Sequence, residues 1–326
     1  MKRILICMIA ILLAITTVSF AEEQSQIQDT LLAIGSATTG LPAEKPDQIM
    51  VAQLDNEPGA RPQLGIGAAD VVYEAVLYKG GYTRYTAVFN DEIPEQIEAV
   101  RSARIVNADI YLEYGGAFIH YGGQQYEGSS VYNYFDTVNM QVRYDGLSDG
   151  KNFYRDNQRS APNNVVGRIG QMYDNIAWTN VTCKSPLKFS ESYTAKGTPA
   201  SSVSVKYRSG YEPSYKYADG TYYRYYNGSE HKDGLDGEQL TCSNVILHYA
   251  DYAWYDGASD RPIVTLTGSN KCEYFIGGMH FTGYWERSSV NDSTVYYDDE
   301  GNQVAFKPGK TFIQIVSGSE EIKIAE

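Results

Sequence analysis

The sequence predicts an α+β protein, with an N-terminal mixed α/β domain followed by a smaller all-β C-terminal domain. Three observations support this prediction. The first half holds two apolar segments that read as a hairpin, followed by a segment with helical spacing. From Val203 onward, short stretches of alternating apolar and polar residues recur at regular turn spacing. Tyrosine, which suits a half-buried pleated surface, is frequent, with 29 residues against 10 phenylalanines.

The chain begins with the pattern of a secretion signal, residues 1–21. Lys2 and Arg3 precede an apolar run from Ile4 to Val18, and small residues allow cleavage after Ala21. An uncleaved anchor is the alternative, but a spanning helix needs about 20 apolar residues. The only nearby cysteine, Cys7, lies inside the apolar run, so no lipobox is present. We therefore expect an extracytoplasmic protein, secreted or associated with the envelope, without a lipid anchor and without a transmembrane segment after cleavage.

Residues 22–45 are small and polar with little periodicity, which predicts a flexible tether. The N-terminal domain is expected over residues 46–190. Within it, Asp70–Leu77 and Tyr82–Phe89 predict a β-hairpin across a glycine turn. The spacing of apolar residues in Ser102–Tyr114 predicts a helix that stops at two glycines, and Ala117–Tyr121 predicts a strand.

Residues 188–202 have the composition of a loop and separate the two predicted domains. The C-terminal β domain is expected over residues 200–320. Its strands are punctuated by the turn signals Asp219-Gly220, Asn227-Gly228 and Glu300-Gly301. A meander or barrel-like arrangement fits this pattern.

The mature chain is expected to be strongly acidic. The sequence has 27 basic and 40 acidic residues, and loss of Lys2 and Arg3 with the signal leaves 25 against 40, a net charge near −15. Nucleic-acid binding relies on clustered Lys and Arg that neutralise phosphates, and an acidic surface repels anionic membranes. We therefore expect neither nucleic acid nor an anionic membrane surface as a partner.

The sequence predicts no metal site and no cofactor. It contains no GxSxG, HExxH, SxxK or Walker pattern, and its four histidines lack the spacing of metal ligands. The remaining cysteines, Cys183, Cys242 and Cys272, form no CxxC pair. They could be three buried thiols, or Cys242 and Cys272 could form a disulfide.

Arginine dominates the cations of the N-terminal part. Residues 46–170 contain eight arginines and two lysines. The planar fork of arginine pairs bidentately with carboxylate or phosphate, so the bias indicates either an anion pocket or structural ion pairs.

Three clusters concentrate these residues: 54–63, 100–104 and 153–164. The second cluster lies at the expected start of a helix, where free backbone N–H groups favour an anion. Between the second and third, a strand ends in a double glycine, which permits close approach of a ligand. The predicted ligand-binding residues are Asn56, Arg61, Gln63, Arg84, Arg101, Ser102, Arg104, Gly122, Gly123, Arg155, Arg159 and Asn164.

The catalytic residues, if the protein is an enzyme, would come from the same region. His120 could act as a general acid or base at the strand end, although a lone strand histidine is more often a hydrogen-bonded core residue. Asp55, Asp156 and Glu74 could supply paired carboxylates for hydrolysis of a glycosidic or phosphodiester bond.

The motifs LDNEPGARPQ, ADVVYEA, GGYTRY, VRSAR, HYGG, FYRDxxRxAPNN and PGKTFIQIV resemble those of the YerB-like family of bacterial envelope proteins, in family order. The resemblance covers roughly residues 46–318. It implies an N-terminal α/β domain, a smaller C-terminal β domain and no known activity. Many relatives look like lipoproteins, whereas this chain lacks the lipobox. Where relatives tend to show a Pro-His-Asn run, this chain has Pro162-Asn163-Asn164.

Three functions compete at this point. The leading hypothesis is an envelope protein that binds an anionic or carbohydrate wall component, such as peptidoglycan or its phosphate-bearing polymers, through Arg61, Arg84, Arg101, Arg104, Arg155 and Arg159. The second is a hydrolase that uses the carboxylates and histidine named above. The third is a scaffold that docks another envelope protein through the β-rich C-terminal domain.

Overall fold

The structure is a computed structural model that describes residues 35–126, 129–138, 140–254 and 260–326. The predicted signal peptide, residues 1–21, lies outside the described residues, as do residues 22–34 of the predicted tether. The later part of that segment reaches the globular body, where Ser36, Thr38 and Thr39 are buried.

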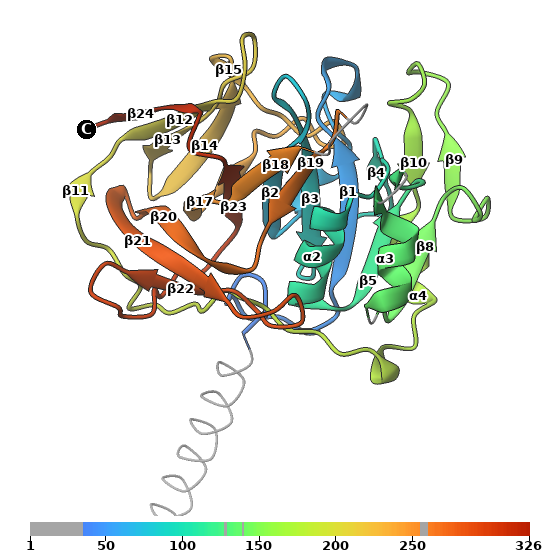
Figure 1. Ribbon diagram of the computed structural model, residues 1–326, viewed down its shortest axis with the longest axis horizontal. Coiled ribbons are helices and arrows are strands. Elements are labelled where there is room, and N and C mark those ends of the chain that lie inside the picture. The colour runs from blue at the N-terminus through green and yellow to red at the C-terminus, as the bar shows by residue number, and fades with distance from the viewer. Residues whose placement is uncertain (1–34, 127–128, 139, 255–259) are drawn as a thin grey trace, which may run out of the picture.

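A mixed sheet of 11 strands runs through the whole molecule (Figure 1). Its strands are β1 (Met50–Asp55), β2 (Val71–Tyr78), β3 (Tyr82–Phe89), β5 (Ala117–His120), β8 (Val142–Asp145), β11 (Thr198–Pro199), β17 (Asn244–Tyr249), β20 (Gly268–Ile276), β21 (Met279–Arg287), β22 (Val295–Asp298) and β23 (Thr311–Val316). The order across the sheet is β11, β21, β20, β17, β23, β2, β3, β1, β5 and β8, with β22 paired to β21. Because β23 pairs in parallel with both β2 and β17, the sheet joins strands from both halves of the sequence.

The other strands form smaller sheets. A six-stranded sheet contains β12 (Ser202–Lys206), β13 (Pro213–Ala218), β14 (Thr221–Tyr226), β15 (Ser229–Glu230), β16 (Thr241–Cys242) and β24 (Glu321–Ala325). A three-stranded sheet contains β4 (Ile97–Glu98), β9 (Phe153–Arg155) and β10 (Val165–Gly167). Two hairpins are made by β6 (Gln125–Tyr126) with β7 (Ser129–Ser130), and by β18 (Asp251–Trp254) with β19 (Pro262–Thr265).

Helices are few and short. The described residues contain the α-helices α2 (Ile105–Tyr114), α3 (Val131–Thr137) and α4 (Ile169–Asp174), and the 3-10 turns η1 (Pro58–Ala60), η2 (Ile66–Ala68) and η3 (Trp178–Asn180). The α-helices have 10, 7 and 6 residues. The expected α+β class with a mixed α/β N-terminal domain is therefore wrong, and the protein is essentially all-β. The physical reason is that smaller sheets and loops, more than helices, cover the apolar faces of the large sheet.

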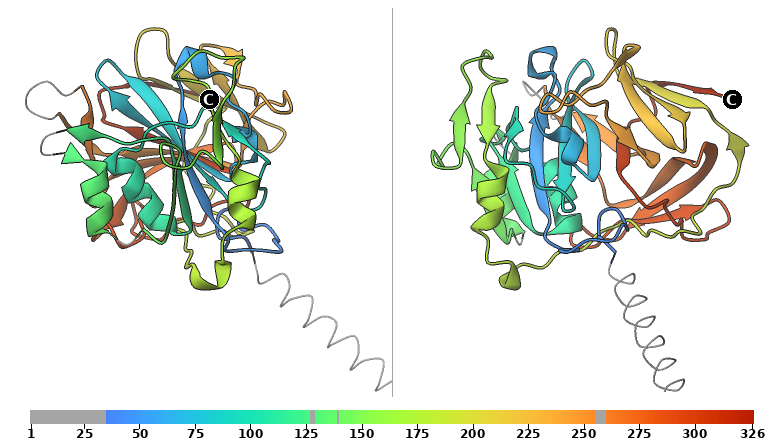
Figure 2. Two further views of the ribbon diagram at one scale, coloured as in Figure 1. Left: turned by 90° about the vertical axis from the view of Figure 1, so that its right-hand side faces the viewer. Right: turned by 180° about the vertical axis from the view of Figure 1, so that it is seen from behind.

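Two hydrophobic cores lie on opposite faces of the large sheet. Along β1, Met50 and Ala52 belong to one core and Val51 to the other, as the alternation of side chains in a strand requires. The first core is closed by α4 together with the three-stranded and six-stranded sheets. The second is closed by α2 and α3 together with β19, β22 and the segment at Val304 and Phe306. The two helices α2 and α3 stand on one side of the strands and α4 on the other (Figure 2). Every residue of β1 is buried because both faces of this strand are covered.

Several local predictions are confirmed. β2 and β3 form the expected antiparallel hairpin, and α2 ends at Gly115 before strand β5. The turn between β13 and β14 has positive φ at both Asp219 and Gly220, as a two-residue hairpin turn requires. The thiols of Cys183, Cys242 and Cys272 are free, and the latter two are buried.

Candidate functional site

A pocket of about 270 Å³ lies where the segment before α2, the end of β5 and the strands β9 and β10 meet. Its lining residues are Val100, Arg101, Ser102, Tyr121, Gly122, Gly123, Leu147, Arg155, Pro162 and Val165. Five of the residues predicted to bind a ligand therefore converge on one cavity. The structure brings together parts of the second and third sequence clusters and the double glycine between them.

Arg101 is oriented by a buried carboxylate behind the pocket. Its Nε donates to Asp55 Oδ2 at 2.5 Å, and the Asp55 side chain has no exposed surface. The other Asp55 oxygen accepts the backbone N–H groups of Asn56 and Glu57, which fixes the carboxylate. The terminal nitrogens of Arg101 make no hydrogen bond to another described residue. The two terminal nitrogens of Arg101 are thus held in one plane and can donate to a ligand.

Arg155 faces the same cavity from β9. Its Nη1 donates to Asn164 Oδ1 at 2.7 Å, and its guanidinium lies 5.1 Å from the centre of the Tyr121 ring. The Asn164 amide in turn donates to the carbonyls of Asp156 and Arg159. Asn164 does not line the pocket, so its role in this geometry is to position Arg155.

The double glycine turns the chain at the pocket wall. Gly122 has φ +72°, a conformation that favours glycine, and its N–H donates to Asp145 Oδ1 at 2.8 Å. Burial would raise the pKa of Asp145, but hydrogen bonds from Tyr132 and from the Gly122 N–H lower it below its ordinary value. A stable carboxylate therefore anchors the turn from behind.

His120 holds the same turn from within the core. Its side chain has no exposed surface, and Nδ1 lies 2.8 Å from the Gly122 carbonyl oxygen, so it donates there as the Nδ1–H tautomer. Burial lowers the pKa of His120, which favours the neutral ring. In this structure the candidate acid–base residue is a buried support for Gly122 and does not reach the cavity.

Arg84 and Arg104 lie on the far side of the Ser102 backbone. Each donates through Nη1 to the Ser102 carbonyl, at 3.1 and 3.4 Å, and through Nη2 to the Tyr78 hydroxyl, at 2.9 and 3.0 Å. Burial raises the pKa of Tyr78, but the surrounding arginines, which include Arg261, outweigh it and lower that pKa. Burial also lowers the pKa of Arg104 to about 10. These two arginines support the pocket backbone and do not line the cavity.

Asn56 of the first sequence cluster belongs to a second, buried network centred on Glu74. Glu74 Oε1 accepts from Asn56, Thr83 and Tyr211 at 2.6–2.9 Å, and its Oε2 accepts from Arg224 at 2.7 Å. Glu74 and Arg224 are both completely buried. The candidate carboxylate at Glu74 is therefore an internal ion-pair partner.

Two more predicted residues extend this network. Gln63 Nε2 donates to the Asp55 carbonyl, and Gln63 Oε1 accepts from His231 Nε2 at 3.1 Å. Arg61 donates to Asn56 and lies between two tyrosine rings, 4.7 and 4.8 Å from their centres. None of these side chains lines the pocket at Arg101, although the chain of contacts reaches Asp55 behind it.

Sequence reasoning missed Arg224 and His231, which complete the network from the C-terminal half. Arg224 Nε donates to His231 Nδ1 at 3.0 Å. Burial, with Arg224 as a second cause, lowers the pKa of His231 well below its ordinary value, so the ring is neutral. The only sequence signal was an arginine among the tyrosines of a strand, and such a residue normally faces solvent.

Arg159 and Asp156 lie in the loop after β9. Arg159 donates to the carbonyls of Ala60 and Pro62, and its Nε lies 3.4 Å from Glu98 Oε2. Burial raises the pKa of Glu98, which Arg159 partly offsets. Asp156 caps its own loop by accepting the Gln158 N–H. Both predicted residues serve local structure and neither lines the pocket.

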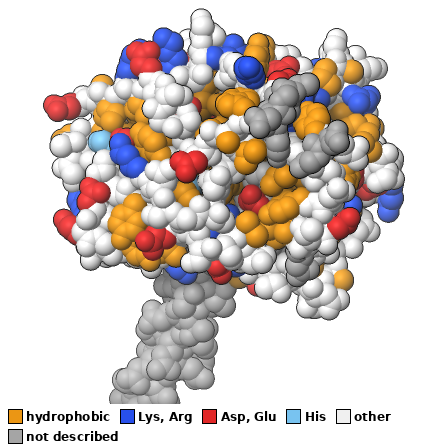
Figure 3. Space-filling view, in the orientation of Figure 1, with side chains coloured by type: hydrophobic (Ala, Val, Ile, Leu, Met, Phe, Trp, Pro, Cys, Tyr) orange, Lys and Arg blue, Asp and Glu red, His pale blue; other side chains and the backbone are white. Residues whose placement is uncertain are grey.

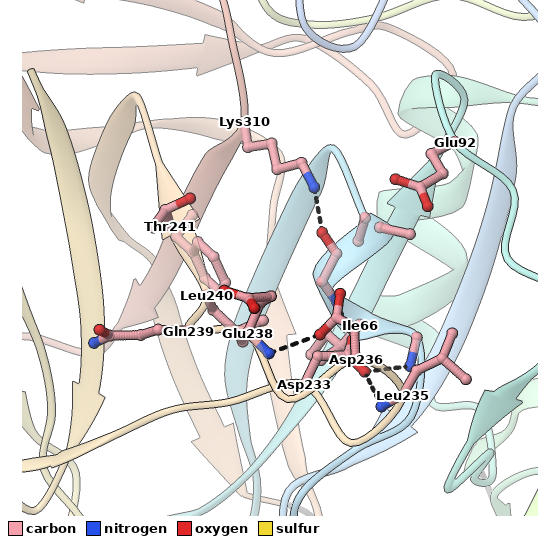
Figure 4. Close-up of a pocket in the computed structure, with 15 residues that line it drawn as sticks. Ile66, Glu92, Asp233, Leu235, Asp236, Glu238, Gln239, Leu240, Thr241 and Lys310 are labelled. Atoms are coloured by element: carbon pink, nitrogen blue, oxygen red, sulfur yellow. Dashed lines mark hydrogen bonds between the residues drawn. The ribbon is translucent and has the colours of Figure 1, made fainter.

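A second pocket, of about 230 Å³, lies between η2 and the loop before β16 (Figure 4). Buried Asp233 accepts the backbone N–H groups of Gly65 and Gly67, and Lys310 Nζ donates to the Gly67 carbonyl. None of the residues predicted to bind a ligand lines this pocket. Its polar contacts join the two halves of the sequence.

One face of the molecule carries mixed charge. On the face shown in Figure 3, basic and acidic side chains lie interspersed among hydrophobic ones. The described residues contain no group of three or more His, Cys, Asp or Glu side chains placed to hold a metal ion. In the same part of the chain, no helix is long and apolar enough to cross a membrane.

Comparison with known proteins gives consistent matches. The family described as "Protein of unknown function (DUF3048)" matches with its N-terminal domain over residues 38–182 and its C-terminal domain over residues 203–313. The chain is 25% identical over 323 residues to the "Putative lipoprotein YerB" of Bacillus subtilis (strain 168), which covers 94% of this chain and 93% of the relative. The crystal structure of YerB protein from Bacillus subtilis is similar with a TM-score of 0.75 and 26% identity, covering 89% of this chain and 99% of that chain.

Proposed function

This chain belongs to the YerB-like DUF3048 family, whose function is unknown, and we propose that it is an extracytoplasmic envelope protein that binds an anionic wall component in the pocket at Arg101 and Arg155. The N-terminal export pattern supports this location, and a relative in Bacillus subtilis carries the name "Putative lipoprotein YerB".

One observation carries the proposal. Two guanidinium groups line one cavity, and each is fixed on one side by a dedicated partner, Asp55 for Arg101 and Asn164 for Arg155. Fixed donors lose little conformational freedom when an anion arrives, so they bind it more tightly than mobile lysines would. The sequence hypothesis also named Arg61, Arg84, Arg104 and Arg159. These four make hydrogen bonds within the protein, so the proposed binding site contains only Arg101 and Arg155.

The geometry favours binding over hydrolysis. A general acid or base must reach the proton that it transfers. Asp55, Glu74 and His120 have no exposed surface, and each is held by hydrogen bonds within the protein. Asp156 is more exposed, but it does not line the pocket.

Arg155→Ala is expected to weaken binding to purified cell walls by about ten- to a hundredfold, because one charge-assisted hydrogen bond contributes roughly 1.5–3 kcal/mol. Arg101→Lys should weaken binding as well, since lysine keeps a charge beside Asp55 but lacks the planar fork. Co-sedimentation of the purified protein with wall fragments measures both. Arg155 is exposed, so its removal does not threaten the fold.

The matched control is Arg208→Ala. Arg208 also places its guanidinium over a tyrosine ring, at 4.3 Å from the centre of Tyr82, but it lies outside the pocket. Its replacement should leave wall binding unchanged. Equal binding by Arg155→Ala, Arg101→Lys and the unaltered protein would refute the proposed site.

A further inference from the structure

The surroundings of the pocket are positively charged. Arg101 is already paired with Asp55, while Arg155 is paired only with the neutral amide of Asn164. Asp145 approaches the turn from behind and is held by Gly122 and Tyr132. Arg84, whose Nε lies 3.9 Å from Asp55, and Arg104 add further positive charge behind Ser102. The cavity therefore favours an anion over a neutral group.

Half of the pocket wall is apolar. Leu147, with 65% of its surface exposed, and the exposed Pro162 supply its accessible apolar surface, while Val100 and Val165, 0% and 1% exposed, belong to the core behind it. The volume of about 270 Å³ lies just below the range of roughly 300–1,000 Å³ typical of small-molecule sites. A cavity of this size accommodates the end group of a larger molecule together with a small apolar substituent.

The donors of the pocket suit a planar anion. Arg101 presents its two terminal nitrogens in one plane, the geometry of bidentate pairing with a carboxylate. The hydroxyl and backbone N–H of Ser102 and the backbone N–H of Gly123 also make no hydrogen bond to another described residue. A carboxylate has two oxygens and about four acceptor positions, so it can engage several of these donors together.

We infer that the ligand of this pocket is the free carboxyl terminus of a peptide whose last residue has a small apolar side chain. The carboxylate pairs with Arg101 and Arg155, and the side chain packs on Leu147 and Pro162. In the cell wall this chemistry occurs at the ends of peptide stems that terminate in D-alanine. The inference rests on the proposed function and names its ligand class.

A phosphodiester in the middle of a polymer fits these observations less well. It is also singly charged, but it carries a substituent on both sides and would need an open groove through the site. The pocket instead places the fixed guanidinium of Arg101 next to a small apolar surface. This arrangement suits the carboxylate and side chain of a terminal residue.

The test is a calorimetric titration of the purified protein with four probes. They are the free acid of diacetyl-Lys-D-Ala-D-Ala, its C-terminal amide, the all-L free acid, and poly(glycerol phosphate). The free acid is expected to bind saturably, and the amide at least tenfold more weakly because it lacks the charge. Arg155→Ala should weaken binding of the free acid by about ten- to a hundredfold, and Leu147→Asp should weaken it through repulsion at the exposed outer side of the pocket. Arg208→Ala should bind like the unaltered protein.

The outcomes separate this inference from the proposed function. Equal binding of acid and amide, or binding of poly(glycerol phosphate) alone, overturns the carboxylate inference. In the second case, loss of polymer binding in Arg155→Ala would still support the anion site. Failure to bind any of the probes or wall fragments overturns both. Preference for the D-alanyl over the all-L peptide identifies wall stems as the source, and the reverse preference identifies protein carboxyl termini.

Discussion

Replacing Arg224 with methionine is expected to lower the free energy of unfolding by about 3–5 kcal/mol, because it leaves Glu74 as an unpaired charge in the interior. Both side chains are completely buried, and Arg224 Nη2 lies 2.7 Å from Glu74 Oε2. No water can replace the lost partner at such depth without opening the core. Methionine fills much of the space, so the expected loss arises mainly from the stranded carboxylate and not from a cavity.

The ion pair also connects two sheets. Glu74 lies on β2 of the large sheet, and Arg224 lies on β14 of the six-stranded sheet. Arg224 further contacts Tyr85 and Tyr215, whose rings lie 5.6 and 5.1 Å from its guanidinium. Its loss should therefore weaken the packing of one sheet on the other as well as the stability of the whole chain.

Urea unfolding followed by circular dichroism measures the effect. The double variant Glu74→Gln with Arg224→Met should lose clearly less than the sum of the two single changes, because glutamine removes the buried charge and keeps an acceptor for Tyr211. The control is Lys206→Met, which removes an exposed pair with Glu321 at 3.1 Å and should leave stability nearly unchanged. If Arg224→Met lowers the free energy of unfolding by less than about 1 kcal/mol, Glu74 is not left as an unpaired buried charge, and the prediction is wrong.

Local features of the fold were predictable from the sequence, and the arrangement of the sheets was not. The hairpin β2–β3 and helix α2 follow from apolar spacing and from the glycines that end each element. The pairing of β23 with β2 places Val71 beside Thr311, and no periodicity within either strand encodes that contact. The expected class failed for this reason, since the faces assigned to helices are covered largely by strands distant in sequence.

For the candidate site too, local features were predictable from the sequence and long-range contacts were not. Clusters of arginine and glycine marked five residues that meet in one cavity, because polar residues with special backbone needs are rarely dense in plain loops. Their individual roles depended on burial, which the sequence does not reveal. The sequence suggested Asp55 and His120 as candidate acid–base residues, but in the structure they orient Arg101 and Gly122. The partners Arg224 and His231 lie more than 140 residues from Glu74 and could be found only in three dimensions.

Asp70→Asn is expected to stabilise the protein at pH 8 and to change its stability little at pH 4. Burial, reinforced by repulsion from Asp91, raises the pKa of Asp70 from 3.8 to about 7. Its Oδ2 accepts the Thr38 hydroxyl at 2.7 Å and the N–H groups of Asn90 and Asp91 at 2.8 and 3.0 Å. An asparagine oxygen at the same place keeps all three hydrogen bonds without the charge.

The sign of the effect follows from proton binding. Between pH 4 and 7 the folded protein holds the Asp70 proton while the unfolded chain has released it, so stability falls as pH rises through this window. A pKa of about 7 against 3.8 corresponds to at most roughly 4 kcal/mol, which is lost by pH 8. Burial also raises the pKa of Asp109, to about 6, so the unaltered protein should lose further stability in the same direction. Subtracting the Asp70→Asn unfolding curve from that of the unaltered protein cancels this contribution and isolates Asp70.

The measurement is urea unfolding of both proteins at pH 4, 6 and 8, with the exposed carboxyl of Asp236 replaced by asparagine as the control. The difference in unfolding free energy between Asp70→Asn and the unaltered protein should grow by about 2–4 kcal/mol from pH 4 to pH 8. The Asp236→Asn difference should stay flat. If the Asp70→Asn difference is also flat, Asp70 is ionised in the folded protein across this range. In that case its three hydrogen bonds, and not its burial, determine its charge, because hydrogen bonds to a carboxylate favour the ionised form.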